Sequence, residues 1–454
     1  MKTSIVILTH NQQEYLQRCI ESIRNYTESG QYEIIVVDNN SDDGTVQWLK
    51  TQQEVTTIYN DQNVGLPAGY NQAIRLADGD TVLLLKQDAV VTQGWLCNLL
   101  ACLYSHEKIG AVAPVTNIAP YYQAVWGGYN NMEEMQVYAK SHNQSAPGKW
   151  EERVKLAGYC MLIKKEVIDK VGLFDEAFTP GGMEDDDYSF RIRLAGYTLF
   201  LCKDTFIHNS GQVLSHTDNR SKFAAKWGFD SIYSTYIRNE IVNLIDKPKD
   251  QPIKVLEVGC ACGGTLLQIK NIYAKAELAG IEFNEQAAAS AGLFADVIAA
   301  DIEKATLPYP KGYFDYIIFA DVLEHLVDPW QALKNVEPYL QAGGRILASI
   351  PNVMHVSVIQ SLLQGQWRYV DAGILDKTHM RFFTLSEIDR MFTSTGYQLA
   401  GYHQTYIHES ETDKHFIQAL TALMGNPQLA AQYQTYQYIV TAAKANGGGA
   451  LPAG

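Results

Sequence analysis

The sequence predicts an α/β protein of two doubly wound domains in tandem, followed by a helical tail. Two observations predict this fold class. Short β-branched runs alternate with helical stretches in both halves of the chain, and in each half the first apolar strand runs into a polar or glycine-bearing turn. The length of 454 residues agrees, because at roughly one domain per 150 residues it exceeds a single compact core.

The expected boundaries are 1–225 for the first domain, 226–405 for the second and 406–454 for the helical tail, whose end from residue 446 we expect to be flexible. An amphipathic stretch at 232–245 precedes Lys247-Pro-Lys-Asp-Gln-Pro252. A helix that ends in two prolines before a new apolar strand indicates a linker helix between domains.

The composition excludes several classes of protein. The net charge is −14, from 50 acidic and 36 basic residues, which argues against a nucleic-acid partner. No apolar run reaches the roughly 20 residues of a transmembrane segment, and the start of the chain is typical of a strand, not of a signal peptide. Seven cysteines without a CxxC pair predict reduced, mostly buried thiols. We therefore expect a cytoplasmic protein.

In the first domain, the apolar segments 4–9, 33–37 and 81–85 are predicted as parallel strands, with a helix over 14–27 as the first crossover. Function in such sheets lies at the carboxyl ends of the strands. The residues found there are polar, namely Thr9, His10, Asn11, Asp38 and Asp88. Their placement predicts a ligand site.

A nucleoside-diphosphate sugar would need a base pocket, a divalent cation for its phosphates and a group that deprotonates the acceptor hydroxyl. Asp38 could accept hydrogen bonds from a uracil-type base or a ribose, or could cap the next helix. Asp88 could hold Mg²⁺ or Mn²⁺ through its oxygens. His208 follows another apolar strand and is either a second metal ligand, a phosphate contact or a structural residue.

The strongest signal is the run Gly181-Gly-Met-Glu-Asp-Asp-Asp-Tyr-Ser-Phe-Arg191. Its successive carboxylates repel one another, which raises the proton affinity of any member held away from solvent. Asp187 and Arg191 are four residues apart on the predicted helix and can pair, which leaves Asp185 on another face and available as a base. The alternative is an acidic helix start that the helix dipole favours.

Over about residues 1–225, the chain resembles the inverting family 2 glycosyltransferases, which implies a GT-A-like nucleotide-sugar domain. The matching segments are Thr9-His-Asn11, the 37–44 and 63–71 segments, Gly158, Glu184-Asp185 with Asp187 and Arg191, and His208. The resemblance implies that Thr9 and Asp38 bind the nucleotide, that Asp88 and His208 bind the metal or the diphosphate, and that Asp185 is the catalytic base of a single displacement.

One position departs from the family's metal motif, which usually has Asp or Asn two residues before its last Asp. This chain has Lys86 there. Either Asp88 serves alone, or the lysine partly replaces the charge of the cation on the phosphates.

The second domain begins with the strand and turn Lys254-Val-Leu-Glu-Val-Gly-Cys-Ala-Cys-Gly-Gly264. Gly259 and Gly263 let the turn approach a ligand closely, and the next helix would face the ligand's polar end. Glu282 ends the following strand, 25 residues after Glu257, at a spacing suited to ribose hydroxyls. This spacing also occurs in dehydrogenases, so NAD is the alternative cofactor.

Two later segments favour S-adenosylmethionine. Asp301 follows a third strand, where it could contact adenine, and Phe314-Asp-Tyr-Ile-Ile-Phe-Ala-Asp-Val-Leu-Glu-His-Leu326 fits a fourth strand with its loop. Over about residues 226–405, the chain looks like a class I S-adenosylmethionine-dependent methyltransferase with a Rossmann-like fold. Glu257, Gly259 and Gly263 match the family's Glu-x-Gly-x-Gly-x-Gly motif, whose middle glycine is replaced by Ala261.

Methylation of a sugar hydroxyl requires the removal of its proton. The candidates are His325 and His379, the latter with Asp376 as an orienting carboxylate. Structural roles are the alternative for both histidines, and Glu324 and His325 could equally cap the next helix.

Together, these patterns predict a bifunctional enzyme of glycan assembly that transfers a hexose-type sugar from a nucleotide-sugar donor and O-methylates a glycan or related acceptor. The expected partners are the nucleotide sugar and a glycan or carrier-linked acceptor, which could bring the protein to a membrane surface. In the alternative, the second domain only binds S-adenosylmethionine or another partner. A two-domain dehydrogenase is disfavoured, because the acidic run would have no role in it.

Overall fold

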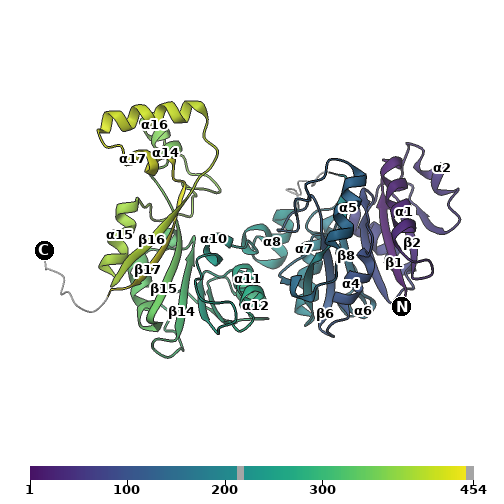
Figure 1. Ribbon diagram of the computed structural model, residues 1–454, viewed down its shortest axis with the longest axis horizontal. Helices are drawn as coiled ribbons and strands as arrows, with labels where there is room; N and C mark the ends of the chain where they lie inside the picture. The colour runs from purple at the N-terminus through teal and green to yellow at the C-terminus, as the bar shows by residue number, and fades with distance from the viewer. Residues whose placement is uncertain (212–218, 446–454) are drawn as a thin grey trace. The chain divides into compact units, whose positions relative to one another are not determined.

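The computed structural model describes residues 1–211 and 219–445, which form two compact units, Met1–Tyr236 and Ile237–Gly454 (Figure 1). The boundary between the units therefore follows Tyr236, whereas we expected it after residue 225. The expected flexible end from residue 446 lies outside the described residues. Within these ranges, no helix has both the length and the apolar character that crossing a membrane requires.

The first unit is built on an eight-stranded mixed sheet in the order β3-β2-β1-β4-β8-β6-β9-β7. Its strands are β1 (Thr3–Thr9), β2 (Tyr32–Asp38), β3 (Val55–Tyr59), β4 (Thr81–Lys86), β6 (Ile109–Val115), β7 (Trp150–Arg153), β8 (Cys160–Lys164) and β9 (Thr198–Phe206). β1, β2 and β4 pair in parallel as predicted. β3, which was not predicted, adds to β2 in parallel. β8, however, runs antiparallel to β4 and β6, and β7 runs antiparallel to β9. The alternation of strands and helices could not reveal this, because β7 and β8 have no crossover helix between them.

The helices of this unit are α1 (Gln13–Tyr26), α2 (Thr45–Leu49), α3 (Leu66–Leu76), α4 (Trp95–Leu103), α5 (Met132–His142), α6 (Lys165–Val171), α7 (Glu184–Leu194), α8 (Arg220–Trp227) and α9 (Ser231–Ser234). α1 shows why they form: Leu16, Cys19, Ile20 and Ile23 recur at helical spacing and are all buried against the sheet. A small antiparallel ribbon of β5 (Ala89–Val90) and β10 (His208–Asn209) lies beyond the end of β4.

The second unit has a seven-stranded sheet in the order β13-β12-β11-β14-β15-β17-β16. Its strands are β11 (Lys254–Val258), β12 (Glu277–Glu282), β13 (Asp296–Ala299), β14 (Phe314–Ala320), β15 (Leu340–Pro351), β16 (Tyr397–Thr405) and β17 (Gln437–Lys444). The first five are parallel, and the strand order reverses between β11 and β14. A ligand is expected at the carboxyl ends of the strands at such a switch point.

The helices of the second unit are α10 (Asn239–Val242), α11 (Gly264–Ile272), α12 (Glu285–Ala291), α13 (Pro329–Val336), α14 (Val356–Leu363), α15 (Leu385–Ser394), α16 (Glu411–Met424) and α17 (Leu429–Gln434). α14, α16 and α17 form a group apart from the sheet (Figure 1), with a small core of their own around Val356, Ile417 and Tyr433.

Two features differ from the sequence analysis. The predicted linker helix over 232–245 is two short helices, α9 and α10, because Ser231 bonds to a buried aspartate of the first unit while Ile241 and Val242 pack in the core of the second. The tail contains the predicted helices α16 and α17, but β17 follows them and pairs antiparallel with both β15 and β16. Residues 437–444 are therefore an inner strand of the sheet, which we did not predict.

Candidate functional sites

Thr9 and Asp38 lie side by side at the carboxyl ends of β1 and β2, where they are register partners. Both are buried. One carboxylate oxygen of Asp38 accepts a hydrogen bond from the amide of Ser41 at 3.1 Å, and the other is buried with no hydrogen-bond partner among the described residues. Asp38 does not cap the next helix, which was the alternative role, because α2 begins after Gly44 without a side-chain cap. An orphaned buried acceptor at a strand end fits a ligand that donates hydrogen bonds.

Asp88 lies between β4 and β5 and is 6% exposed. Its Oδ2 pairs with the Lys86 ammonium at 3.1 Å, whereas its Oδ1 is buried without a hydrogen-bond partner in the described chain. Lys86 occupies the position at which this chain departs from the family's metal motif. It neutralises one oxygen of Asp88 and leaves the other for a ligand.

His208 is brought near Asp88 by the ribbon, in which it pairs with Val90. Its Nδ1 lies 2.7 Å from the Tyr129 hydroxyl, so Nε2 is the nitrogen available to a ligand. Burial lowers the pKa of His208, and the charge of Asp88 opposes that shift. A neutral imidazole beside a carboxylate is a suitable pair of ligands for a divalent cation.

The four carboxylates at the start of α7 have different surroundings. Asp186 accepts hydrogen bonds from the Lys155 ammonium at 2.7 Å and from the Ser231 hydroxyl at 2.5 Å, and all three residues are buried. Asp187 pairs with Arg191 at 2.9 Å, as predicted, and also with Lys226 at 2.6 Å. These two aspartates are neutralised and hold the fold together.

Among the residues that the structure describes, Asp185 forms no ion pair, and two backbone amides donate hydrogen bonds to it. The amide of Gly158 donates to its Oδ2 at 2.8 Å, and that of Asp186 donates to its Oδ1 at 2.9 Å. Burial and the charge of Asp186 raise the pKa of Asp185 to about 6, against the lowering effect of the Gly158 bond and of Lys155. A carboxylate with this pKa is mostly ionised at neutral pH and a stronger base than an ordinary aspartate.

The charges of both the base candidate and the metal candidate act on Tyr70. Burial raises the pKa of this tyrosine well above its ordinary value, and so do the charges of Glu184, Asp185 and Asp88. These carboxylates, from α7 and from the end of β4, therefore act electrostatically on one side chain of α3. Tyr70 lies within the 63–71 segment of the resemblance, but we assigned no role to its side chain, because its position within a helical apolar pattern gives no signal of its own.

The glycine turn of the second unit has the predicted close approaches. Gly259 and Gly263 have φ of 70° and 79°, and a Cβ on either would lie 2.5 Å from a side-chain atom, of Val322 and Phe294 respectively. Ala261 has φ of 47°, so the residue that replaces the family's middle glycine keeps a left-handed turn. Its amide donates to Glu282 at 2.8 Å.

Glu282 and Glu257 stand at the carboxyl ends of neighbouring strands. The two oxygens of Glu282 each accept one backbone amide, from Ala261 and Asn284, both at 2.8 Å. Glu257 is buried, and burial raises its pKa to about 8. One of its oxygens has no hydrogen-bond partner among the described residues, as expected of a group that awaits a ligand.

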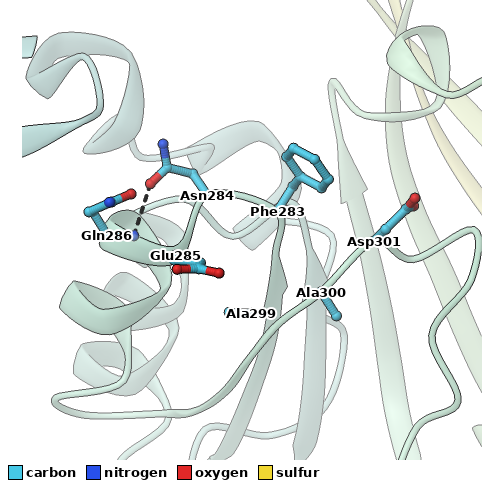
Figure 2. Close-up of a pocket in the computed structure, with 7 residues that line it drawn as sticks. All are labelled: Phe283, Asn284, Glu285, Gln286, Ala299, Ala300 and Asp301. Atoms are coloured by element: carbon cyan, nitrogen blue, oxygen red, sulfur yellow. Dashed lines mark hydrogen bonds between the residues drawn. The ribbon is translucent and has the colours of Figure 1, made fainter.

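A cavity of about 460 Å³ opens beside Glu282, between the loops that follow β12 and β13 (Figure 2). It is lined by Phe283, Asn284, Glu285, Gln286, Ala299, Ala300 and Asp301. The Phe283 ring is 78% exposed, and Figure 2 shows this ring and the Asp301 carboxylate among the side chains that line the cavity. A ring face and a carboxylate in this arrangement suit a flat, hydrogen-bonding group such as a purine.

His325 and His379 come together although they are 54 positions apart in sequence, with ring centroids 4.7 Å apart. Asp376 was expected to orient the His379 ring, but it does not. Its Nδ1 lies 2.9 Å from the carbonyl of Ile374, while Asp376 accepts hydrogen bonds from the amide and hydroxyl of Thr378. Asp376 is a turn residue, because its side chain folds back on its own loop.

Comparisons with known proteins agree with this division into two units. Residues 4–172 match the family model "Glycosyl transferase family 2", and residues 229–400 match the family model "Methyltransferase domain". The chain therefore carries a family 2 glycosyltransferase domain followed by a methyltransferase domain.

Three curated relatives illustrate the similarity. An uncharacterized glycosyltransferase, YfnE of Bacillus subtilis, is 26% identical over 45% of this chain and 63% of its own length. Glycosyltransferase AglE of Haloferax volcanii is 24% identical over 45% of this chain and 64% of its own. Ajmaline N-methyltransferase of Rauvolfia serpentina is 30% identical over 22% of this chain and 37% of its own. The chain thus spans less than two thirds of each relative.

Proposed function

We propose that this two-domain transferase is a bifunctional enzyme of glycan assembly, in which the first unit glycosylates an acceptor hydroxyl with inversion and the second unit O-methylates a glycan or related acceptor. The observation that carries the first activity is Asp185. Among the four consecutive carboxylates 184–187, Asp185 combines a pKa raised to about 6 with hydrogen bonds from two backbone amides, which fix its orientation.

In the first reaction, Thr9 and Asp38 would bind the nucleotide of the donor, because a buried oxygen of Asp38 needs a hydrogen-bond donor. Asp88 and His208 would hold Mg²⁺ or Mn²⁺, which when bound would neutralise charge on the diphosphate. Asp185 takes the proton of the acceptor hydroxyl. The acceptor oxygen then bonds to the anomeric carbon as the opposite carbon–oxygen bond breaks, with its electron pair leaving on the nucleoside diphosphate.

In the second reaction, Glu257, Glu282 and the glycine turn would bind the methionine and ribose parts of S-adenosylmethionine, and Asp301 in the cavity would contact its adenine. The cofactor supplies a methyl group on a positively charged sulfur. Positioning accounts for much of the acceleration of such an in-line displacement. His325 and His379 are the groups through which the acceptor hydroxyl would lose its proton.

The main support for the alternative, a non-catalytic second domain, would be Ala261, which replaces the middle glycine of the family's motif. Because this residue keeps the left-handed turn and its bond to Glu282, no feature of the turn favours that alternative. We also propose action in the cytoplasm, since all seven cysteines are free thiols.

The test separates the two halves. The full chain is incubated with a panel of nucleotide sugars and Mn²⁺, and donor hydrolysis or transfer is measured with and without a chelator. If Asp88 is a metal ligand, Asp88→Ala weakens metal-dependent donor binding, whereas undiminished activity in chelator would favour Lys86 as the charge carrier. In thermal-shift measurements, S-adenosylmethionine should stabilise the protein and NAD should not.

A further inference from the structure

We propose that Glu324, His325 and His379 form a site for a first-row transition-metal dication in the second unit. This inference rests on the proposed methyl transfer and deepens it, because the cation would take over the activation of the acceptor hydroxyl. The ligand atoms of these three side chains all lie within 4.8 Å of one another. Two imidazoles and one carboxylate are a donor set that suits Zn²⁺, Mn²⁺, Fe²⁺ or Co²⁺.

The Glu324 carboxylate is the first independent observation. It is 1% exposed, and among the described residues neither of its oxygens has a hydrogen-bond partner from another residue. A buried carboxylate without partners is costly unless a proton or a cation compensates it. The neighbouring Asp321 does not compete for this role, because its oxygens already bind Ser349 and Arg238.

The orientation of the two rings is the second observation. Nδ1 of His379 lies 2.9 Å from the Ile374 carbonyl, and Nδ1 of His325 lies 3.3 Å from the Thr378 carbonyl and 3.2 Å from its hydroxyl. The Thr378 hydroxyl donates to Asp376, so its oxygen can accept from His325. A histidine that ligates a metal commonly donates its other N–H to such a group, which fixes Nε2 as the ligand atom.

The position of the cluster connects it with methyl transfer. Glu324 and His325 belong to the short helix η3 (Leu323–His325) at the carboxyl end of β14, and the loop before η3 contacts the glycine turn, where a Cβ on Gly259 would lie 2.5 Å from Val322. His379 comes from the loop between α14 and α15. The cluster therefore lies at the end of the sheet where the cofactor is proposed to bind.

The spacing of the three side chains suits coordination of one ion. Ligands bound at about 2.1 Å in a tetrahedral site lie roughly 3.4 Å apart, and the ligand atoms here all lie within 4.8 Å of one another. Three protein ligands leave a position for the acceptor oxygen. The bound hydroxyl releases its proton to water, its electron pair forms the oxygen–carbon bond to the methyl group, and the sulfur–carbon pair stays on sulfur, giving S-adenosylhomocysteine.

The experiment titrates Co²⁺ into chelator-treated full-length protein and follows its visible absorption. We expect bands typical of nitrogen and oxygen coordination, and a loss of Co²⁺ affinity of at least about tenfold in His379→Ala and in Glu324→Gln. Because His379 is on a partly exposed loop and Gln preserves the shape of Glu324, both variants should fold; thermal unfolding checks this. His415→Ala, on the exposed face of α16, is the matched control and should leave the bands unchanged.

Asp88→Ala distinguishes this site from that of the first unit, because the bands should persist in this variant. Identical titrations of the wild type, His379→Ala and Glu324→Gln would overturn the inference, as would bands that disappear only in Asp88→Ala. S-Adenosylmethionine binding is measured by calorimetry on the same samples. If the protein binds S-adenosylmethionine but shows no Co²⁺ bands, the metal site alone is refuted. If the Co²⁺ bands appear but S-adenosylmethionine does not bind, the proposed methyl transfer is refuted.

Discussion

The two units assemble their carboxylates in opposite ways. In the first, four acidic residues are consecutive in sequence at the start of α7, and partners from distant segments separate their roles: Lys155 neutralises Asp186, while Gly158 only orients Asp185. In the second, Glu257, Glu282 and Asp301 are far apart in sequence, and the ends of neighbouring strands gather them. Adjacency in sequence therefore does not make residues equivalent, and separation does not prevent them from sharing a site.

The largest effect should follow from replacing the base. Asp185→Asn removes the proton acceptor but preserves its size, so glycosyl transfer should fall about 10²–10⁴-fold while donor binding remains nearly unchanged. Rates are measured with the best donor of the panel, and binding is measured by calorimetry. Transfer at the wild-type rate would refute the base assignment and the distinction between Asp185 and its neighbours.

The adjacent residue should affect stability instead. Asp186→Asn leaves the Lys155 ammonium, only 3% exposed, without its counter-charge, and should destabilise the first unit by about 3–5 kcal/mol. Scanning calorimetry of the full chain would show its transition at a lower temperature. The control is Asp175→Asn, which breaks a partly exposed pair with Lys226 and should cost less than about 1 kcal/mol. Equal effects would mean that Asp186 is not a structural anchor.

In the second unit, Glu282→Ala should weaken S-adenosylmethionine binding about a hundredfold, or roughly 2–3 kcal/mol, because it removes charge-assisted ribose contacts and the support of the Ala261 amide. Calorimetry on the full chain measures this. Glu285→Ala, which removes an exposed side chain of the same cavity, should change the affinity little. Glycosyl transfer should be unaffected, and its loss would show that the units do not work independently.

The smallest effect is a pH dependence confined to the first unit. Asp185 must be ionised to accept a proton, and its pKa is about 6. The rate of glycosyl transfer should therefore level off above this pH and fall about tenfold for each pH unit below it. A rate that is flat down to pH 5 would mean that another group, or none, takes the proton.

Local patterns predicted most of the fold. The strands that carry Thr9, Asp38, Glu257 and Glu282 could be predicted because each is a short apolar run that ends at a polar residue or a glycine turn. β17 could not, because it follows two helices and takes its place only through pairing with β15 and β16. No local signal specifies such a pairing.

The same limit applies to the sites. The acidic run was visible in the sequence, and so was the Asp187–Arg191 pair at helical spacing. The structural role of Asp186 depends on its hydrogen bonds with Lys155 and Ser231, which are 31 and 45 residues away. Nothing in the sequence marked these two residues as its partners. Likewise, Glu324 was considered only as a helix cap from the sequence, and it became a candidate metal ligand only because the fold brings His379 beside it.

The inner position of β17 has a consequence for the order in which this protein can mature on the ribosome. Residues 1–236 contain every strand of the first sheet, so that unit can fold while the second is still being translated. The second sheet has to wait for residues 437–444, and until they emerge β15 keeps an unpaired edge and the core positions of Tyr438 and Val440 are unfilled. The site that we propose for the sugar donor would thus form on the nascent chain before the methyltransferase fold is complete.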